Sequence, residues 1–189
     1  MEIQLQAVSK RYRREWIFRK ITQNFQTGQQ YAILGPNGSG KSTLLRVLSG
    51  HLTPTKGKVI FSNQNESIDP DSVYQHISYA GPYIDLIEEL TLTESINFHQ
   101  RFKPFREKLN TANLIDLLGF QKSANKQIRY FSSGMKQRLK LALSICSNTP
   151  ILLLDEPTTN LDQQGMDWYV KLINTYTCLL YTSPSPRDS

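Results

Sequence analysis

Apolar and polar residues alternate in several short stretches of this chain. The alternation over residues 3–7 predicts a strand with one buried face, and residues 21–25 are expected to pair with it. Residues 31–34 form a short apolar run directly before Gly35, which predicts a buried parallel strand. Other apolar stretches predict three more strands, at residues 59–61, 77–80 and 151–154.

Helical spacing of apolar residues marks the stretches between these strands. Residues 41–49 predict a helix that stops at Gly50, and residues 166–176 predict a final helix. Three more helices are expected within residues 82–148: one opened by Thr93, Glu94 and Ser95, one over residues 110–118 closed by Gly119, and one from Gly134 to about Ser147 capped by Ser132 and Ser133. This order of elements predicts an α/β core interrupted by a helical insertion.

Composition is ordinary for a soluble globular protein. The chain has 189 residues, of which 39% are hydrophobic and 20% are charged. Its longest apolar runs are four residues, whereas a membrane-spanning helix needs about twenty, so we expect no passage through a bilayer. Residues 1–4 begin no secretory signal. Cys146 and Cys178 are too few and too far apart for a disulfide framework or a metal site, which favours a reducing, cytosolic location.

Basic side chains outnumber acidic ones by 22 to 16, for a net charge of +6. Six basic residues fall within one short stretch: Lys10, Arg11, Arg13, Arg14, Arg19 and Lys20. Such a cluster is compatible with nucleic acid or anionic lipid, although a solvated face near a phosphate ligand is the commoner interpretation. We therefore do not expect nucleic acid as a partner.

Residues 178–189 read Cys-Leu-Leu-Tyr-Thr-Ser-Pro-Ser-Pro-Arg-Asp-Ser. A Ser/Pro-rich tail is one interpretation, but the first eleven of these residues also match one reading frame of a DNA that resembles a transposon-end sequencing adapter. We expect this tail to be non-native. Residues 1–177 would then be the native part, cut short at its end, with Cys146 as its single cysteine.

The strongest chemical signal is the stretch Gly-Pro-Asn-Gly-Ser-Gly-Lys-Ser-Thr, a phosphate-loop pattern between a predicted strand and a predicted helix. Small residues let successive backbone N–H groups face an anion, and the helix dipole adds to their field. Lys41 brings a positive charge to the outer phosphates, and the Ser42 hydroxyl is placed for Mg²⁺. The residues predicted to bind nucleotide here are Gly35, Pro36, Asn37, Gly38, Ser39, Gly40, Lys41, Ser42 and Thr43.

Two acids, Asp155 and Glu156, follow the predicted strand at residues 151–154. A carboxylate at the end of a strand can hold hydrated Mg²⁺, so we predict Asp155 as a metal ligand beside Ser42. Glu156 can polarise an attacking water and is the predicted catalytic base. Paired acids alone are a weak signal because they often only cap a helix, but together with the phosphate loop they favour nucleotide hydrolysis.

Two further motifs flank these acids: Phe-Ser-Ser-Gly-Met-Lys-Gln-Arg at residues 131–138, and Pro-Thr-Thr-Asn-Leu-Asp at residues 157–162. With the motifs in this order and spacing, the chain resembles the nucleotide-binding subunits of ATP-binding cassette (ABC) transporters over residues 1–177. The resemblance implies a P-loop NTPase core with a mixed, mainly parallel sheet and an inserted α-helical subdomain. The implied boundaries are residues 1–81 and 149–177 for the core and 82–148 for the helical subdomain.

The resemblance also implies roles for single residues. Tyr12 resembles the aromatic residue that stacks on adenine, with Trp16 as its rival. Asp162 resembles a residue in the loop that crosses a dimer interface. A signature loop, which caps the γ-phosphate held by a second subunit, corresponds to Ser132, Ser133 and Gly134. We expect two subunits to close head to tail on two ATP molecules with Mg²⁺, hydrolyse them and reopen.

Three departures from the family pattern stand out. The usual signature, Leu-Ser-Gly-Gly-Gln, reads Phe-Ser-Ser-Gly-Met here, which keeps the serine and the second glycine, so we expect function with altered detail. Pro82 lies where the family has a glutamine, which puts that glutamine's Mg²⁺ and membrane-coupling contact in doubt. The switch histidine expected after Asp162 is missing, because every histidine precedes Asp155 (His51, His76, His99). The shortened end would explain this, and we expect turnover to be low.

The function expected from the resemblance is an ATP-binding and ATP-hydrolysing subunit that powers a separate membrane permease. It would act as a homodimer or with a related ATPase subunit, in the cytoplasm on the inner face of the cell membrane. The alternative is a soluble family member acting on ribosomes or nucleic acid, which would predict a second cassette or a long coiled insertion. A small P-loop kinase or GTPase is a third class, but residues 125–128 read Asn-Lys-Gln-Ile and lack the guanine-reading aspartate.

Overall fold

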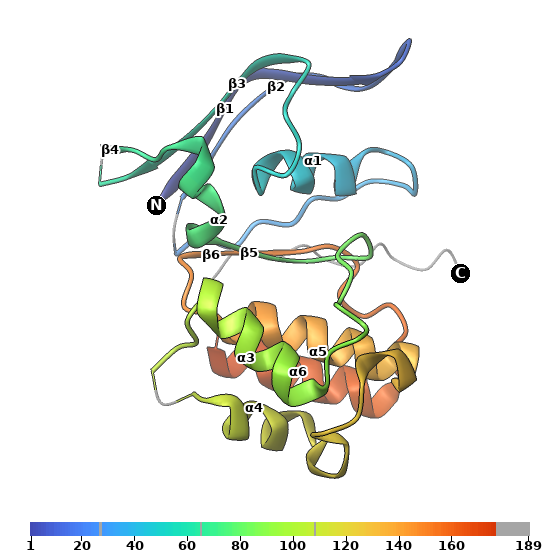
Figure 1. The fold of residues 1–189 in the computed structure, drawn as a ribbon. Coiled ribbons are helices and arrows are strands. Elements are labelled where there is room, and N and C mark those ends of the chain that lie inside the picture. The colour runs from blue at the N-terminus through green and yellow to red at the C-terminus, as the bar shows by residue number, and fades with distance from the viewer. Residues whose placement is uncertain (27, 65, 108, 177–189) are drawn as a thin grey trace. The chain divides into compact units, whose positions relative to one another are not determined.

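The computed structural model describes residues 1–26, 28–64, 66–107 and 109–176, so the expected non-native tail at residues 178–189 lies outside the described residues. The described chain forms two compact units (Figure 1). The first unit consists of residues 1–79 and 150–155. The second consists of residues 80–149 and the stretch that follows Asp155.

A four-stranded antiparallel sheet makes up much of the first unit. Its strands are β1 (Glu2–Tyr12), β2 (Glu15–Gln26), β3 (Lys56–Asn63) and β4 (Glu66–Ser67), in the order β2-β1-β3-β4. Ile3 lies opposite Phe25 on β2 and Phe61 on β3, and all three side chains are buried. The strand predicted near the start and its partner are therefore confirmed. The alternation breaks at a bulge, where Ala7 is exposed and Val8 is buried.

The remaining elements of the first unit are short. They are the helices α1 (Lys41–Leu48) and α2 (Val73–His76), the 3₁₀ turn η1 (Pro70–Ser72), and the strands β5 (Ile77–Ala80) and β6 (Ile151–Leu154). β5 and β6 pair with each other, and every side chain of both strands is buried. The apolar stretches at 77–80 and 151–154 thus form the strands that the sequence predicts, and β6 delivers Asp155 at its end.

Residues 31–34 do not form the buried strand predicted for them. Their backbone belongs to no strand, and Leu34 is 72% exposed. A parallel strand is held by hydrogen bonds to its neighbours, but residues 31–34 pair with none of the strands β1 to β6 in the described part of the chain. The run therefore has no ladder to join, and this prediction was wrong.

The second unit is helical. Its elements are α3 (Leu92–Phe102), α4 (Thr111–Leu118), the 3₁₀ turns η2 (Gln121–Ser123) and η3 (Ile128–Tyr130), α5 (Ser133–Cys146) and α6 (Gln163–Tyr176). Thr91, rather than the predicted Thr93, caps α3, because its side chain forms a reciprocal capping box with Glu94. Gly119 closes α4 in a left-handed conformation, as predicted.

α6 groups with the other helices, whereas the sequence assigns it to the core. It packs against α5 and buries Tyr169 and Leu172. An amphipathic helix stays with the apolar surface that it covers, which accounts for the difference. The boundaries expected from the resemblance remain a prediction about functional domains. None of the helices in the described chain combines the length and apolar character that a membrane span needs.

The C-terminal end of α4 is held by side chains from two other helices. The carbonyl of Leu118 accepts a hydrogen bond from Arg138 Nη2 at 2.8 Å, and that of Leu117 accepts one from Trp168 Nε1 at 2.9 Å. The Arg138 guanidinium also lies 5.1 Å from the ring centre of Phe120 and 4.7 Å from that of Trp168. The last carbonyls of a helix lack partners within the helix, and α5 and α6 supply them here.

Candidate functional site

The predicted phosphate loop leads into α1 as a tight turn. The backbone N–H of Ser39 donates to the Pro36 carbonyl at 3.2 Å, and that of Leu44 donates to Gly40 at 2.8 Å, which opens the helix. Gly40 has φ +94°, and a Cβ atom there would lie 2.5 Å from Cγ2 of Ile17 on β2. Only glycine lets β2 approach this turn so closely.

Lys41, the first residue of α1, lies over this loop. Its ammonium group donates to the carbonyls of Gly35 at 2.8 Å and Pro36 at 2.9 Å. Both bonds are local and partly exposed, so they are of the modest kind that a more strongly charged acceptor can replace. The lysine is therefore positioned at the mouth of the turn that the sequence assigns to phosphate.

Ser42 and Asp155 are 113 residues apart in the sequence and meet in the first unit. The Ser42 hydroxyl donates to Asp155 Oδ1 at 3.0 Å, and Tyr79 donates its hydroxyl to Oδ2 at 3.1 Å. Asp155 is only 3% exposed. The sequence predicts the first two residues as partners, and the structure brings them together. The sequence did not indicate a role for Tyr79 at this site, because a tyrosine in a buried strand usually reflects packing alone.

The oxygen atoms of Ser42 and Asp155 are of the kind that Mg²⁺ prefers. Mg²⁺ prefers oxygen and is usually bound by one or two carboxylates together with phosphates and waters. Within the described residues there is no cluster of three or more His, Cys, Asp or Glu side chains that could hold a metal without such help.

Cys146 is buried, and burial raises the pKa of its thiol to about 12, so it stays protonated near neutral pH.

Glu156 begins the second unit by its contacts, although it follows Asp155 directly in the chain. It is exposed, and its backbone has φ +49°, a left-handed conformation that costs free energy for a side chain with a Cβ atom. Thr159 donates its backbone N–H to the Glu156 carbonyl at 3.1 Å, which closes the turn. The role of Glu156 as catalytic base remains a prediction.

The hairpin between β1 and β2 carries both candidate adenine-stacking residues. Tyr12 is 43% exposed and pairs with Glu15, with Lys10 Nζ 5.3 Å from its ring centre. The ring of Trp16 is contacted by three cations: Arg11 at 5.3 Å, Arg19 at 4.8 Å and Lys56 at 5.9 Å. Tyr12 is the more exposed of the two side chains, and one cation lies near its ring where three lie near that of half-buried Trp16. This favours Tyr12, although its contact with adenine is still a prediction.

The signature residues form the start of α5 in the second unit. Ser132 caps this helix and accepts a hydrogen bond from the backbone of Met135 at 3.2 Å. A Cβ atom on Gly134 would lie 3.1 Å from the carbonyl oxygen of Asn160, so the turn after β6 approaches closely. Gln137 reinforces this contact by donating to the Pro157 carbonyl at 2.9 Å.

Asp162 directly precedes α6 in the same unit. Its Oδ1 accepts a hydrogen bond from the backbone N–H of Gly165 at 2.8 Å, an N-cap contact. The signature residues and the loop ending at Asp162 are thus joined within one unit. Ser133 is the first residue of α5.

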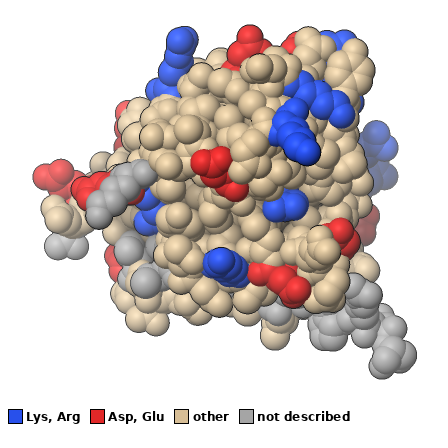
Figure 2. Space-filling model, turned by 90° about the horizontal axis from the view of Figure 1, so that it is seen from below, with Lys and Arg blue, Asp and Glu red and all other residues tan. Residues whose placement is uncertain are grey.

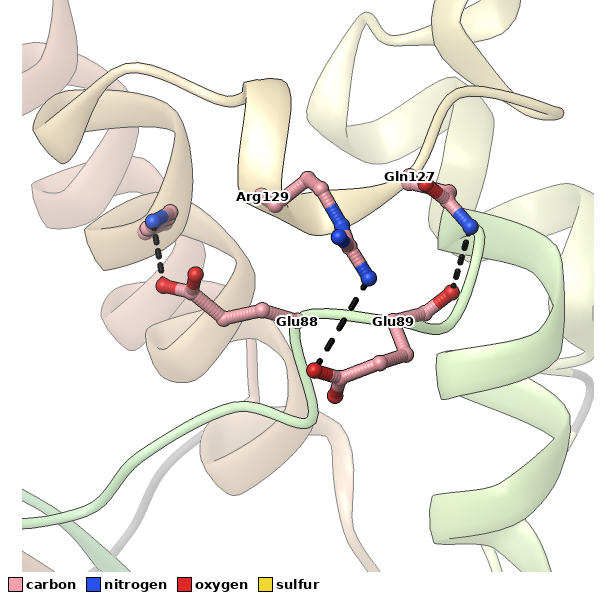
Figure 3. A network of polar contacts seen from close by, with 5 residues as sticks. Glu88, Glu89, Gln127 and Arg129 are labelled. Atoms are coloured by element: carbon pink, nitrogen blue, oxygen red, sulfur yellow. Dashed lines mark hydrogen bonds and ion pairs between the residues drawn. The ribbon is translucent and has the colours of Figure 1, made fainter.

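A polar network connects the segment after β5 to the start of α5 (Figure 3). Lys136 donates to Glu88 Oε1 at 2.5 Å, and this bond holds the pKa of the Glu88 carboxyl below its usual value. Arg129 lies 3.8 Å from Glu89, whose backbone carbonyl accepts a bond from Gln127 at 3.0 Å. The sequence did not reveal this network, because its partners lie far apart along the chain.

Charge is mixed on the face shown in Figure 2, where basic and acidic side chains are interspersed among neutral ones. The net charge of +6 is therefore not gathered into one patch on that face.

A mixed α/β fold with a phosphate loop and a nearby acid-ended strand defines a P-loop nucleotide-binding cassette. The family described as "ABC transporter" matches residues 18–159, and the chain belongs to that family.

Similar proteins include the daunorubicin/doxorubicin resistance ATP-binding protein DrrA of Streptomyces peucetius. It is 35% identical over 85% of this chain and 51% of DrrA. The ABC transporter ATP-binding protein YcbN of Bacillus subtilis is 29% identical over 87% of this chain and 53% of YcbN. The chain therefore spans about half the length of these two relatives. The lantibiotic transport ATP-binding protein SrtF of Streptococcus pyogenes is 29% identical over 92% of this chain and 74% of SrtF.

Solved structures share the fold. The dimeric bacterial ABC transporter cassette MJ0796 superposes with a TM-score of 0.78 at 24% identity, covering 96% of this chain and 87% of that one. A second structure of MJ0796, in a post-hydrolysis state bound to ADP and Pi, gives a TM-score of 0.79 at 23% identity over the same shares. At this identity the likeness establishes the fold.

Proposed function

We propose that the chain is an ATP-binding and ATP-hydrolysing subunit of an ABC transporter, acting with a separate membrane permease. The observation that carries this proposal is the hydrogen-bonded pair Ser42 and Asp155 beside a phosphate loop with Lys41 over it. An ammonium group, a hydroxyl and a buried carboxylate in this arrangement suit a nucleotide triphosphate accompanied by Mg²⁺. Family membership supports the same conclusion.

The phosphate loop, residues 35–43, would bind the phosphates through its backbone N–H groups and the positive end of α1. Lys41 would exchange its bonds to the Gly35 and Pro36 carbonyls for bonds to phosphate oxygens. Ser42 and Asp155 would hold Mg²⁺, which supplies charge neutralisation for the phosphate oxygens. Tyr12 would stack on adenine.

Glu156 would accept the proton of the attacking water, since it is an exposed carboxylate next to a metal ligand in the chain. Base assistance is typically worth about 10²–10⁴-fold in rate. Glu156→Gln keeps the shape of the side chain but removes this capacity. It should therefore reduce hydrolysis by this order while leaving ATP binding intact.

The signature residues would act on ATP held by a second subunit, either another copy or a related ATPase. Ser132, Ser133 and Gly134 lie at the N-terminal end of α5, a 14-residue helix, where the helix dipole favours an anion. Asp162 caps α6 at the end of the loop whose Asn160 carbonyl lies close to Gly134. The relatives named for transport favour a permease partner and a position at the cytoplasmic side of the membrane. They do not favour a ribosomal or nucleic-acid role.

Isothermal titration calorimetry with ATP and Mg²⁺ tests the proposal. A hydrogen bond to a charged group contributes about 1.5–3 kcal/mol, which corresponds to a loss of about 10- to 150-fold in affinity for Lys41→Met. Lys58→Met is the matched control, because Lys58 is an exposed lysine on β3 of the same unit. Equal ATP affinity of the Lys41 variant and the control would refute the proposed site.

A further inference from the structure

The buried carboxylate of Asp155 is held from two sides. Ser42, in the first turn of α1, donates to Oδ1, and Tyr79, on the neighbouring strand β5, donates to Oδ2 at 3.1 Å. The two oxygens of the carboxylate thus have different partners, supplied by a helix and a strand on different stretches of the chain.

Tyr79 is well fixed in this position. It is only 7% exposed, and β5, the strand that carries it, pairs directly with β6, which ends just before Asp155. The ring of His51 lies 5.9 Å from the Tyr79 ring at an angle of 46°, and adds a second contact. A buried tyrosine hydroxyl normally finds a hydrogen-bond partner because burying it without one is costly. Here that partner is the carboxylate.

Resting on the function proposed above, we infer that Tyr79 is a positioning residue for the Mg²⁺ site. Its hydroxyl holds Oδ2 of Asp155 and so fixes the rotation of the carboxylate. Oδ1 of Asp155 then points toward Ser42, so that Oδ1 and the Ser42 hydroxyl oxygen can bind the same ion. Groups that hydrogen-bond to a metal ligand commonly orient it in this way.

The small number of protein ligands makes this orientation important. The described residues contain no group of three or more Asp, Glu, His or Cys side chains that could hold a metal ion, so the proposed site combines Ser42 and Asp155 with phosphate and water oxygens. Mg²⁺ demands near-ideal octahedral geometry. With Ser42 and Asp155 as its protein ligands, a rotated carboxylate would lose a large share of the protein's contribution.

Tyr79→Phe removes the hydroxyl and keeps the ring. ATP binding is measured first in EDTA and then as a function of Mg²⁺ concentration, by calorimetry or with a fluorescent ATP analogue. We expect the Mg²⁺ concentration for half-maximal enhancement of binding to rise about tenfold, the low end of the range for partners of metal ligands. Binding in EDTA should be unchanged. Tyr74→Phe is the matched control, because Tyr74 is a 45% exposed tyrosine of the same unit, on α2.

A second variant separates positioning from packing. Tyr79→Leu also lacks the hydroxyl but packs less well, so its urea midpoint should fall further than that of Tyr79→Phe. The Mg²⁺ shift should nevertheless be the same in both variants. An unchanged Mg²⁺ dependence in Tyr79→Phe, or a shift that follows the loss of stability, would overturn the inference while leaving ATP binding in place. If the unmodified chain shows no Mg²⁺-dependent ATP binding, the proposed function itself fails.

Discussion

Gly40→Ala tests how tightly β2 closes on the phosphate loop. Gly40 has φ +94° and precedes Lys41 directly, and the added Cβ atom would lie 2.5 Å from Cγ2 of Ile17 and 3.5 Å from Cδ1 of Phe18. Side chains do not tolerate the first of these distances, so either Ile17 or the loop must move. The substitution therefore combines a strained backbone with a steric clash.

The two contributions can be separated within the loop. Gly38 has a similar conformation, φ +79°, but nothing lies within 4 Å of a Cβ atom built there. Gly38→Ala should therefore show the backbone cost alone, about 1–2 kcal/mol. Gly40→Ala should add the cost of overpacking, about 1–3 kcal/mol. The difference between the two variants, about 1–3 kcal/mol, measures the contact with Ile17.

Urea unfolding of both variants, without nucleotide, provides the measurement. We expect the midpoint to fall for both and to fall further for Gly40→Ala, with equal dependence on urea concentration. The double variant Gly40→Ala, Ile17→Ala should recover part of the difference by removing the clashing methyl group. Equal losses for Gly38→Ala and Gly40→Ala would refute the close approach of β2.

Two other predictions concern the second unit. Burial, aided by the charge of Lys103, lowers the pKa of His99 to about 4 from its ordinary value near 6.5. Because the unfolded chain then binds a proton more readily than the folded one, the stability that neutral His99 allows is complete above pH 6.5 and is lost as the pH falls toward 4. The free energy of unfolding should fall by about 3 kcal/mol over this pH range. Urea unfolding at several pH values measures the loss, and His99→Gln should no longer show it. An unaltered pH dependence in that variant would contradict the assignment. Gly134→Asp should place a carboxylate at the N-terminal end of α5, which is proposed to face a γ-phosphate of the second subunit. ATP should still bind, because the phosphate loop is unchanged, but it should no longer produce dimers in gel filtration. Dimers that form normally would argue against a role of Gly134 across an interface.

Local sequence patterns predicted most of the elements that build the site. The glycines and the lysine of the phosphate loop mark the start of α1, and the apolar run at residues 151–154 forms β6 and leads to Asp155. Both signals are local, because a turn needs particular residues and a buried strand needs consecutive apolar ones. The meeting of Ser42 and Asp155 also followed, because the same family pattern contains both.

Features that depend on distant partners were missed or mistaken. Residues 31–34 have the composition of a buried strand, but a strand also needs a neighbour to bond with, and the pattern contains no information about the neighbour. The bond between Tyr79 and Asp155 joins residues 76 positions apart. The pairing of β5 with β6 creates it, and one sequence without relatives does not show that pairing.

The capping of α4 by other helices has a consequence for the order in which the second unit forms. Trp168 lies 51 residues after Leu117, whose carbonyl it binds, while Arg138 lies 20 residues after Leu118. On a growing polypeptide, α4 emerges first, its end is first bound when α5 follows, and it receives its second partner only after Trp168 has been synthesised. Closing a long loop costs entropy that only the completed contacts repay. The second unit is therefore expected to mature in stages during translation, and the end of α4 gains its last described partner only when α6 forms.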